Sequence, residues 1–213
     1  MFLTEEQYNR ILSLLDKRIA SGPLLGELNQ WSEEQYHLKV HDYICDQTNN
    51  GLTRLKIVVW DYIQQKKLMD GANYDKAIQK AYAEKFAELA RKYDMHPEYH
   101  KAEDIFVCGD AIKDQIISKG IYAHKDEIEA LKQGDIWKVY LENCSVSIFY
   151  ETDEQIERHA QDGRSEQLRR QIEAILRRDD KYHVFIHGVQ CNFTSKQTLD
   201  ERYQGNMFYY HMR

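Results

Sequence analysis

Apolar residues recur at helical spacing through the first half of the chain, and local signals mark where each predicted helix begins and ends. A Thr-x-x-Gln capping box opens a predicted helix over 4–21, which Ser21-Gly22-Pro23 ends. A Ser-x-x-Gln box opens a second helix at Ser32, with Asn49-Asn50-Gly51 as its end. Because the apolar residues at its start also alternate, a strand over 36–40 is the alternative.

Two further helices complete the N-terminal pattern. Thr53 would cap a helix whose apolar residues over 55–63 face inward, although the β-branched run Ile57-Val58-Val59 favours a strand instead. Residues 74–93 carry a continuous apolar stripe with Lys, Glu and Gln at most other positions, the strongest helical pattern in the chain. Because four helices with short links usually pack side by side, the first half predicts a helical bundle.

The second half changes period, and short apolar runs alternate with helical stretches. With the first half, this predicts an α+β fold: a helical N-terminal region over 1–95, then a mixed, mainly antiparallel sheet with helices over 96–213. No Pro/Gly/Ser linker separates the regions, so one continuous domain is the alternative, and we find no internal repeat in the sequence. The predicted strands are 104–108, 136–141, 146–150, 183–193 and 207–211, and the predicted helices are 111–119, 121–132, 152–178 (broken at Asp162-Gly163) and 194–203.

Composition narrows the class of protein. Apolar residues make up 42% and charged residues 30% of the chain, which is typical of globular proteins. No apolar run reaches the roughly 18 residues of a membrane helix, and the N-terminus lacks the basic-then-apolar pattern of a secretory signal. The 4 cysteines are too scattered for a disulfide framework. We therefore expect a soluble, cytoplasmic protein that does not bind membranes.

The net charge of −6 argues against nucleic-acid binding, which depends on neutralising phosphates with clustered Lys and Arg. The basic run 169–178 has Glu166 four residues before Arg170 and Glu173 four residues before Arg177, so a salt-paired helix surface explains it. An acidic surface suits a basic protein partner, because opposite charges speed association.

Six of the 9 histidines fall into three His-x-x-x-His pairs, a spacing that places two imidazoles on one face of a helix. Glu34, His37 and His41 would share such a face on the second predicted helix, which makes them candidate ligands for one divalent metal. The His-Glu-x-x-His motif of zinc proteases is absent. We predict no resident cofactor, with a divalent metal at these three residues as the alternative.

The other two pairs are weaker candidates for a metal. Pro97 follows His96 directly, which predicts a turn in which His96 is a cap residue. His183 and His187 lie in a predicted strand, where a four-residue separation amounts to about 13 Å, too far for one ion.

Cys108 is the candidate catalytic nucleophile. It ends a predicted strand and precedes Gly109 and a predicted helix, so its thiol would feel the partial positive charge of the helix N-terminus, which would lower its pKa. The competing interpretation is a buried cysteine that closes a strand, with Asp110 as the cap of the helix.

Tyrosine is unusually frequent, 15 against 7 phenylalanines, and it suits half-buried positions and recognition surfaces. In the predicted C-terminal strand, Phe208 and Tyr210 face one side and Tyr209 the other, which leaves one aromatic side for a partner. The chain contains no phosphate-binding loop, calcium loop or Gly-x-Ser-x-Gly motif. The sequence therefore favours protein–protein recognition, as in an adaptor, an inhibitor or an immunity-type protein. The alternatives are a metal-dependent or cysteine-dependent hydrolase and a self-assembling protein, since the sequence leaves a homo-oligomer open.

Overall fold

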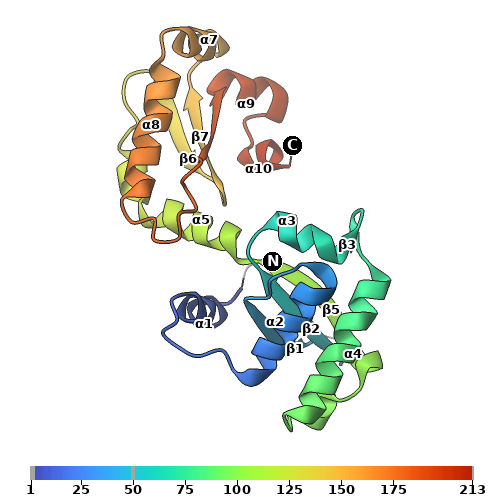
Figure 1. Cartoon of the computed structure of the whole chain (residues 1–213). Helices are drawn as coiled ribbons and strands as arrows, with labels where there is room; N and C mark the ends of the chain where they lie inside the picture. The colour runs from blue at the N-terminus through green and yellow to red at the C-terminus, as the bar shows by residue number, and fades with distance from the viewer. Residues whose placement is uncertain (1–2, 49–50, 213) are drawn as a thin grey trace. The chain divides into compact units, whose positions relative to one another are not determined.

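The computed structural model describes residues 3–48 and 51–212, and the chain divides into two compact units, Met1–Lys113 and Asp114–Arg213 (Figure 1). Each unit contains a three-stranded sheet with helices around it, so the predicted α+β class is confirmed. Among the described residues, no helix is both long enough and apolar enough to cross a membrane. The predicted turn at Asn49-Asn50 lies outside the described residues.

The first unit is built on the sheet β1-β2-β5, in which β1 and β2 are antiparallel and β2 and β5 are parallel. Its strands are β1 (Asp42–Gln47), β2 (Thr53–Val59) and β5 (Ile105–Ala111), with a small ribbon of β3 (Met69–Asp70) and β4 (Asn73–Tyr74). Its helices are α1 (Glu5–Leu15), α2 (Pro23–Tyr36), α3 (Tyr62–Gln65) and α4 (Lys76–Lys92), with short 3-10 turns at Lys66–Leu68, Pro97–Tyr99 and Ala102–Asp104.

Two helices of this unit begin close to where the sequence predicts them, but the first ends at Leu15 and not at the predicted stop Ser21-Gly22-Pro23. The capping box of Thr4 and Gln7 starts α1, and the side chain of Asp75 accepts hydrogen bonds from two backbone N–H groups at the start of α4. The apolar stripe of α4 buries Tyr82 and Phe86 completely, and the Phe86 ring lies 5.3 Å from that of Tyr43 on β1. This helix therefore supplies much of the core of the first unit.

The predicted N-terminal helix bundle is wrong, because the segments 42–47 and 53–59 pair as strands. The run Ile57-Val58-Val59 is fully buried within the sheet, where β-branched side chains pack well. Ser32 does not begin a helix. It lies inside α2, which begins at Pro23, and its hydroxyl donates to the carbonyl of Leu38 at 2.7 Å. Strand β5 pairs with β2 and so belongs with the first unit, although it lies beyond residue 95.

The second unit is built on the sheet β6-β7-β8, with β6 and β7 antiparallel and β7 and β8 parallel. The helical stretch predicted over 152–178 begins at Asp153, with Thr152 as its cap, and it breaks at Asp162-Gly163 as predicted, whereas the predicted strand 207–211 is a helix. Because β7 and β8 are parallel, the sheet is not mainly antiparallel. The elements are α5 (Ile112–Ala123), which begins at the end of the first unit, α6 (Lys125–Glu129), β6 (Ile136–Leu141), β7 (Ser145–Tyr150), α7 (Asp153–Gln161), α8 (Arg164–Arg177), β8 (Gln190–Ser195), α9 (Lys196–Tyr203) and α10 (Met207–His211).

The two units repeat one topology, although the sequence shows no repeat. In each, an antiparallel hairpin is followed by a helical crossover, a third strand parallel to the second, and a helix that begins directly after that strand. The backbone contacts at the ends of the parallel strands match as well. The Lys113 N–H donates to the Trp60 carbonyl at 2.9 Å, and the Gln197 N–H donates to the Glu151 carbonyl at 3.2 Å. In both units the donor is the second residue of the helix that follows the third strand.

A carboxylate also recurs at the same position of both hairpins. In the first unit, Asp46 lies opposite Arg54 and accepts two hydrogen bonds from its guanidinium, both at 2.7 Å. In the second unit, Glu142 lies opposite Ser145 and accepts hydrogen bonds from Ser145, at 3.1 Å, and from Ser147. The two sheets therefore share a polar position on one face while the residue types differ.

Candidate functional site

The structure does not bring the predicted metal ligands onto one helix face. Glu34 lies on α2, but this helix ends at Tyr36, and His37 takes a left-handed backbone with φ 49°. His41 lies beyond the helix, where its N–H donates to the carbonyl of Val58 at 2.8 Å. Among the described residues, no three His, Cys, Asp or Glu side chains gather as metal ligands would. Metal binding at Glu34, His37 and His41 stays a prediction without support from geometry.

The remaining histidine pairs also lie in turns. His96 precedes a 3-10 turn that begins at Pro97, which confirms its predicted position as a cap. His183 and His187 lie before β8 rather than within a strand, and His183 has a left-handed backbone with φ 55°.

Cys108 lies within β5, in register with Lys56 of β2. Burial raises the pKa of its thiol to about 11, although the charges of Arg54 and Lys56 act to lower it. The helix α5 begins at Ile112, four residues later, so the thiol is not at a helix N-terminus. The thiol is therefore protonated at neutral pH, and the predicted activation by a helix dipole has no support from the geometry.

The predicted binding residues at the C-terminus lie on the helix α10. Asn206 caps this helix by accepting a hydrogen bond from the Phe208 N–H at 2.8 Å. Tyr210 is fully buried, and its ring lies 5.1 Å from that of Phe149 and 5.4 Å from that of Tyr203. Helical rotation, rather than strand alternation, therefore decides which of these aromatic side chains face the core.

The outward side of α10 carries large apolar side chains. Phe208, Tyr209 and Met212 are 63%, 49% and 72% exposed, and the rings of Phe208 and Tyr209 lie 6.1 Å apart. Met212 is the C-cap residue directly after α10, four residues from Phe208 and three from Tyr209, a spacing that places all three on one side of the helix and its C-terminal end. We call these three residues the C-terminal aromatic surface. Phe208 and Tyr209 are predicted as binding residues on a strand, whereas they lie on a helix, and Met212 is not predicted.

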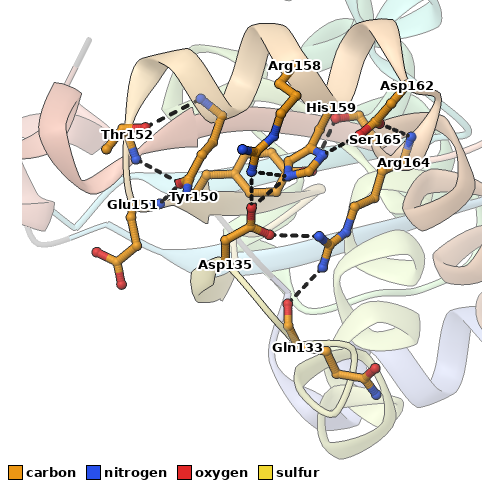
Figure 2. Close-up of polar contacts among 11 residues, drawn as sticks. Gln133, Asp135, Tyr150, Glu151, Thr152, Arg158, His159, Asp162, Arg164 and Ser165 are labelled. Carbon is orange, nitrogen blue, oxygen red and sulfur yellow. Dashed lines mark hydrogen bonds and ion pairs between the residues drawn. The ribbon is translucent and has the colours of Figure 1, made fainter.

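Sequence reasoning also missed a dense polar cluster around His159 in the second unit (Figure 2). The imidazole is almost completely buried, with its Nδ1 2.9 Å from Asp162 and its Nε2 2.8 Å from Asp135. Asp135 also accepts hydrogen bonds from Arg158 at 2.6 Å and from Arg164 at 2.7 Å. Burial raises the pKa of Asp135, but the hydrogen bond from His159 and the nearby positive charges outweigh it, so the pKa is lowered overall.

The connections of this cluster indicate a structural role. It joins the residue before β6 to the end of α7 and the start of α8, and the His159 ring packs on Tyr150 at 4.9 Å. The Tyr150 hydroxyl in turn hydrogen-bonds to Ser165 at 3.1 Å. Both nitrogens of His159 are already bonded to protein groups, which leaves neither of them for a substrate. We therefore interpret the cluster as a link between elements rather than a reaction centre.

Comparisons with known proteins add no relative to this description. No family model, no curated protein and no solved structure matches the chain.

Proposed function

We propose that the protein acts by recognising another protein through the C-terminal aromatic surface of Phe208, Tyr209 and Met212. The observation that carries the proposal is that the five-residue helix α10 and its C-cap residue Met212 expose three large apolar side chains to solvent, while Tyr210 anchors the helix in the core. Exposed apolar side chains that gather in one place often mark interaction sites.

The residue types support this function. Tyrosine, phenylalanine and methionine are enriched at protein interfaces, where aromatic rings bury a large area at little cost in side-chain entropy. The net charge of −6 favours a partner with a basic surface, because opposite charges speed association. Such a role is that of an adaptor, an inhibitor or an immunity-type protein.

The hydrolase alternative has less support. A cysteine-dependent enzyme needs a thiolate, whereas burial raises the pKa of Cys108 to about 11. A metal-dependent enzyme needs ligands that converge on one ion. Glu34 lies on α2, His37 is the C-cap of that helix, and His41 lies in the separate segment before β1.

The proposal is tested by quantitative co-purification from the native cells. We compare the wild-type protein with the triple variant Phe208→Ser, Tyr209→Ser, Met212→Ser. A matched control, Tyr62→Ser with Ile63→Ser on α3, removes side chains that are 52% and 75% exposed. We expect a partner that the wild type and the control enrich equally and that the triple variant loses.

The purified partner should then bind the triple variant at least about tenfold more weakly than it binds the wild type, as loss of interface anchors predicts. Equal recovery of all bound proteins by the three forms would contradict the proposal. A sedimentation measurement that shows a dimer of the wild type, but a monomer of the triple variant, would instead make the surface a self-association site.

A further inference from the structure

A second candidate binding site lies in the first unit, in a groove of ≈ 530 Å³ between the end of α1, the loop that follows it and α2. In Figure 1 these elements are the dark blue helix α1 and the blue helix α2 with their connecting loop. The segment Lys39–His41 closes the other side. The volume is within the range of small-molecule sites.

The walls of the groove are apolar. They are formed mainly by Leu14 and Leu15 at the end of α1, Ile19 in the loop, Leu25 on α2 and Val40. Ile19 is 46% exposed at the edge of the groove. The groove therefore offers an apolar surface that the chain leaves partly in contact with water.

The polar lining is positively charged, and none of the described residues that form it carries a carboxylate. Lys17 and Lys39 line the groove, and neither forms an ion pair with another described residue. His41 lies beside them, and burial, together with the charge of Lys39, lowers its pKa to about 4. At neutral pH its uncharged imidazole can accept or donate a hydrogen bond. The groove thus combines apolar walls with two ammonium groups.

The backbone at Lys17 takes a left-handed conformation at the edge of the groove. Helix α1 ends in a Schellman motif, in which the Arg18 N–H donates to the Ser13 carbonyl at 2.9 Å and the Lys17 N–H donates to the Leu14 carbonyl at 3.0 Å. The left-handed position of this motif, which usually holds glycine, is occupied by Lys17 with φ 56°. A lysine is strained there, so replacing it with glycine separates the stability of the fold from the charge of the groove.

We propose that this groove binds a small apolar molecule that carries one anionic head, with Lys17 and Lys39 holding the head and Leu14, Ile19 and Val40 covering the apolar body. A charged head between two unpaired ammonium groups gains charge-assisted hydrogen bonds, which are the strongest polar contacts available to such a ligand. A carboxylate and a phosphate share this chemistry. The groove is lined by first-unit residues alone, so the proposal is independent of the C-terminal aromatic surface.

Isothermal titration of the full chain with decanoate, decyl phosphate and decanol tests the charge requirement. We expect at least one of the two anions to bind about tenfold or more tightly than decanol, and the tighter anion identifies the head group. Equal binding of decanol, or no binding of either anion, would overturn the proposal.

Three variants test the location. Lys17→Gly relieves the strained backbone, so its melting temperature should rise while its affinity for the anion falls about tenfold, the loss expected for one charge-assisted contact. Gln204→Gly, at another left-handed position with φ 55°, is the control that should raise the melting temperature without changing affinity. A Cβ built at Gly26 meets nothing within 4 Å, so Gly26→Trp should fill the groove, keep the fold and abolish binding. Unchanged affinity in either Lys17→Gly or Gly26→Trp would overturn the proposal.

Discussion

At the scale of single residues, burial decides the chemistry of the thiols more than their position in the sequence does. Cys108 follows an apolar run and precedes a helix, which is a placement that can activate a thiol. In the fold, it lies in register with Lys56 of the neighbouring parallel strand and is half-buried, and burial raises the pKa of its thiol to about 11. Burial likewise raises the pKa of Cys45 to about 12 and that of Cys191 to about 11.

Cys108 should therefore react slowly with iodoacetamide at pH 7.5, because only a very small fraction is thiolate, and its rate should keep rising as the pH approaches 11. Labelling of each cysteine is measured by mass spectrometry of peptides. In guanidinium chloride, where the chain unfolds and burial is lost, the pH dependence of labelling should give the ordinary thiol pKa of about 8.5. Labelling of folded Cys108 at pH 7.5 as fast as in the unfolded chain would contradict this account.

At the scale of elements, the orientation of α10 depends on Tyr210. Its ring is fully buried against Phe149 and Tyr203, whereas the neighbouring Tyr209 is 49% exposed. Tyr210→Ala should reduce the free energy of unfolding by about 3 kcal/mol or more, because it leaves a cavity. Tyr209→Ala should reduce it by less than about 0.5 kcal/mol, because its ring has little packing to lose.

Urea denaturation of the two variants measures this difference. Similar small losses at both positions would show that α10 is not docked, and the C-terminal aromatic surface would then lack the anchor that the proposed function needs. A large loss for Tyr209→Ala would mean that this ring is buried in solution.

Elements with complete local signals could be predicted from the sequence. The capping box at Thr4 marks the start of α1, the predicted helix from residue 152 begins at the cap Thr152, and the long apolar stripe marks α4. Local signals failed where a short apolar run fits two periods. The run over 53–59 fits both a helical and a strand period. It forms the strand β2 because it is buried between β1 and β5. The five residues of α10 have strand-like composition, but the cap at Asn206 and the burial of Tyr210 select the helix.

The candidate sites show the same limit. The cluster around His159 joins Asp135 to a residue 24 positions away, so no local spacing could reveal it. His37 and His41 have the spacing that places two ligands on one helix face, but the helix ends at Tyr36, so the two side chains do not share a face. At the C-terminus, residue type alone pointed to a segment in which the fold leaves Phe208 and Tyr209 exposed.

At the scale of the whole molecule, two units with one topology carry different surfaces. The first unit holds a groove with apolar walls and two lysines, and the second ends in the C-terminal aromatic surface. The repeated topology is supported by matching contacts at Trp60 and Glu151, which the sequence does not reveal because the residues themselves differ. We infer that the repeated fold is a common scaffold and that the unlike residues on it set what each unit binds.

The most direct test of protein recognition is photo-cross-linking in the native cells with a benzophenone amino acid placed at position 208 or, as a control, at position 62. Both side chains are exposed, 63% and 52% respectively. We predict that position 208 gives a cross-linked species containing one other, basic protein, and that position 62 gives none. The absence of any cross-link at 208, the same partner at both positions, or a product of two copies of this chain would contradict recognition of a separate partner at this surface.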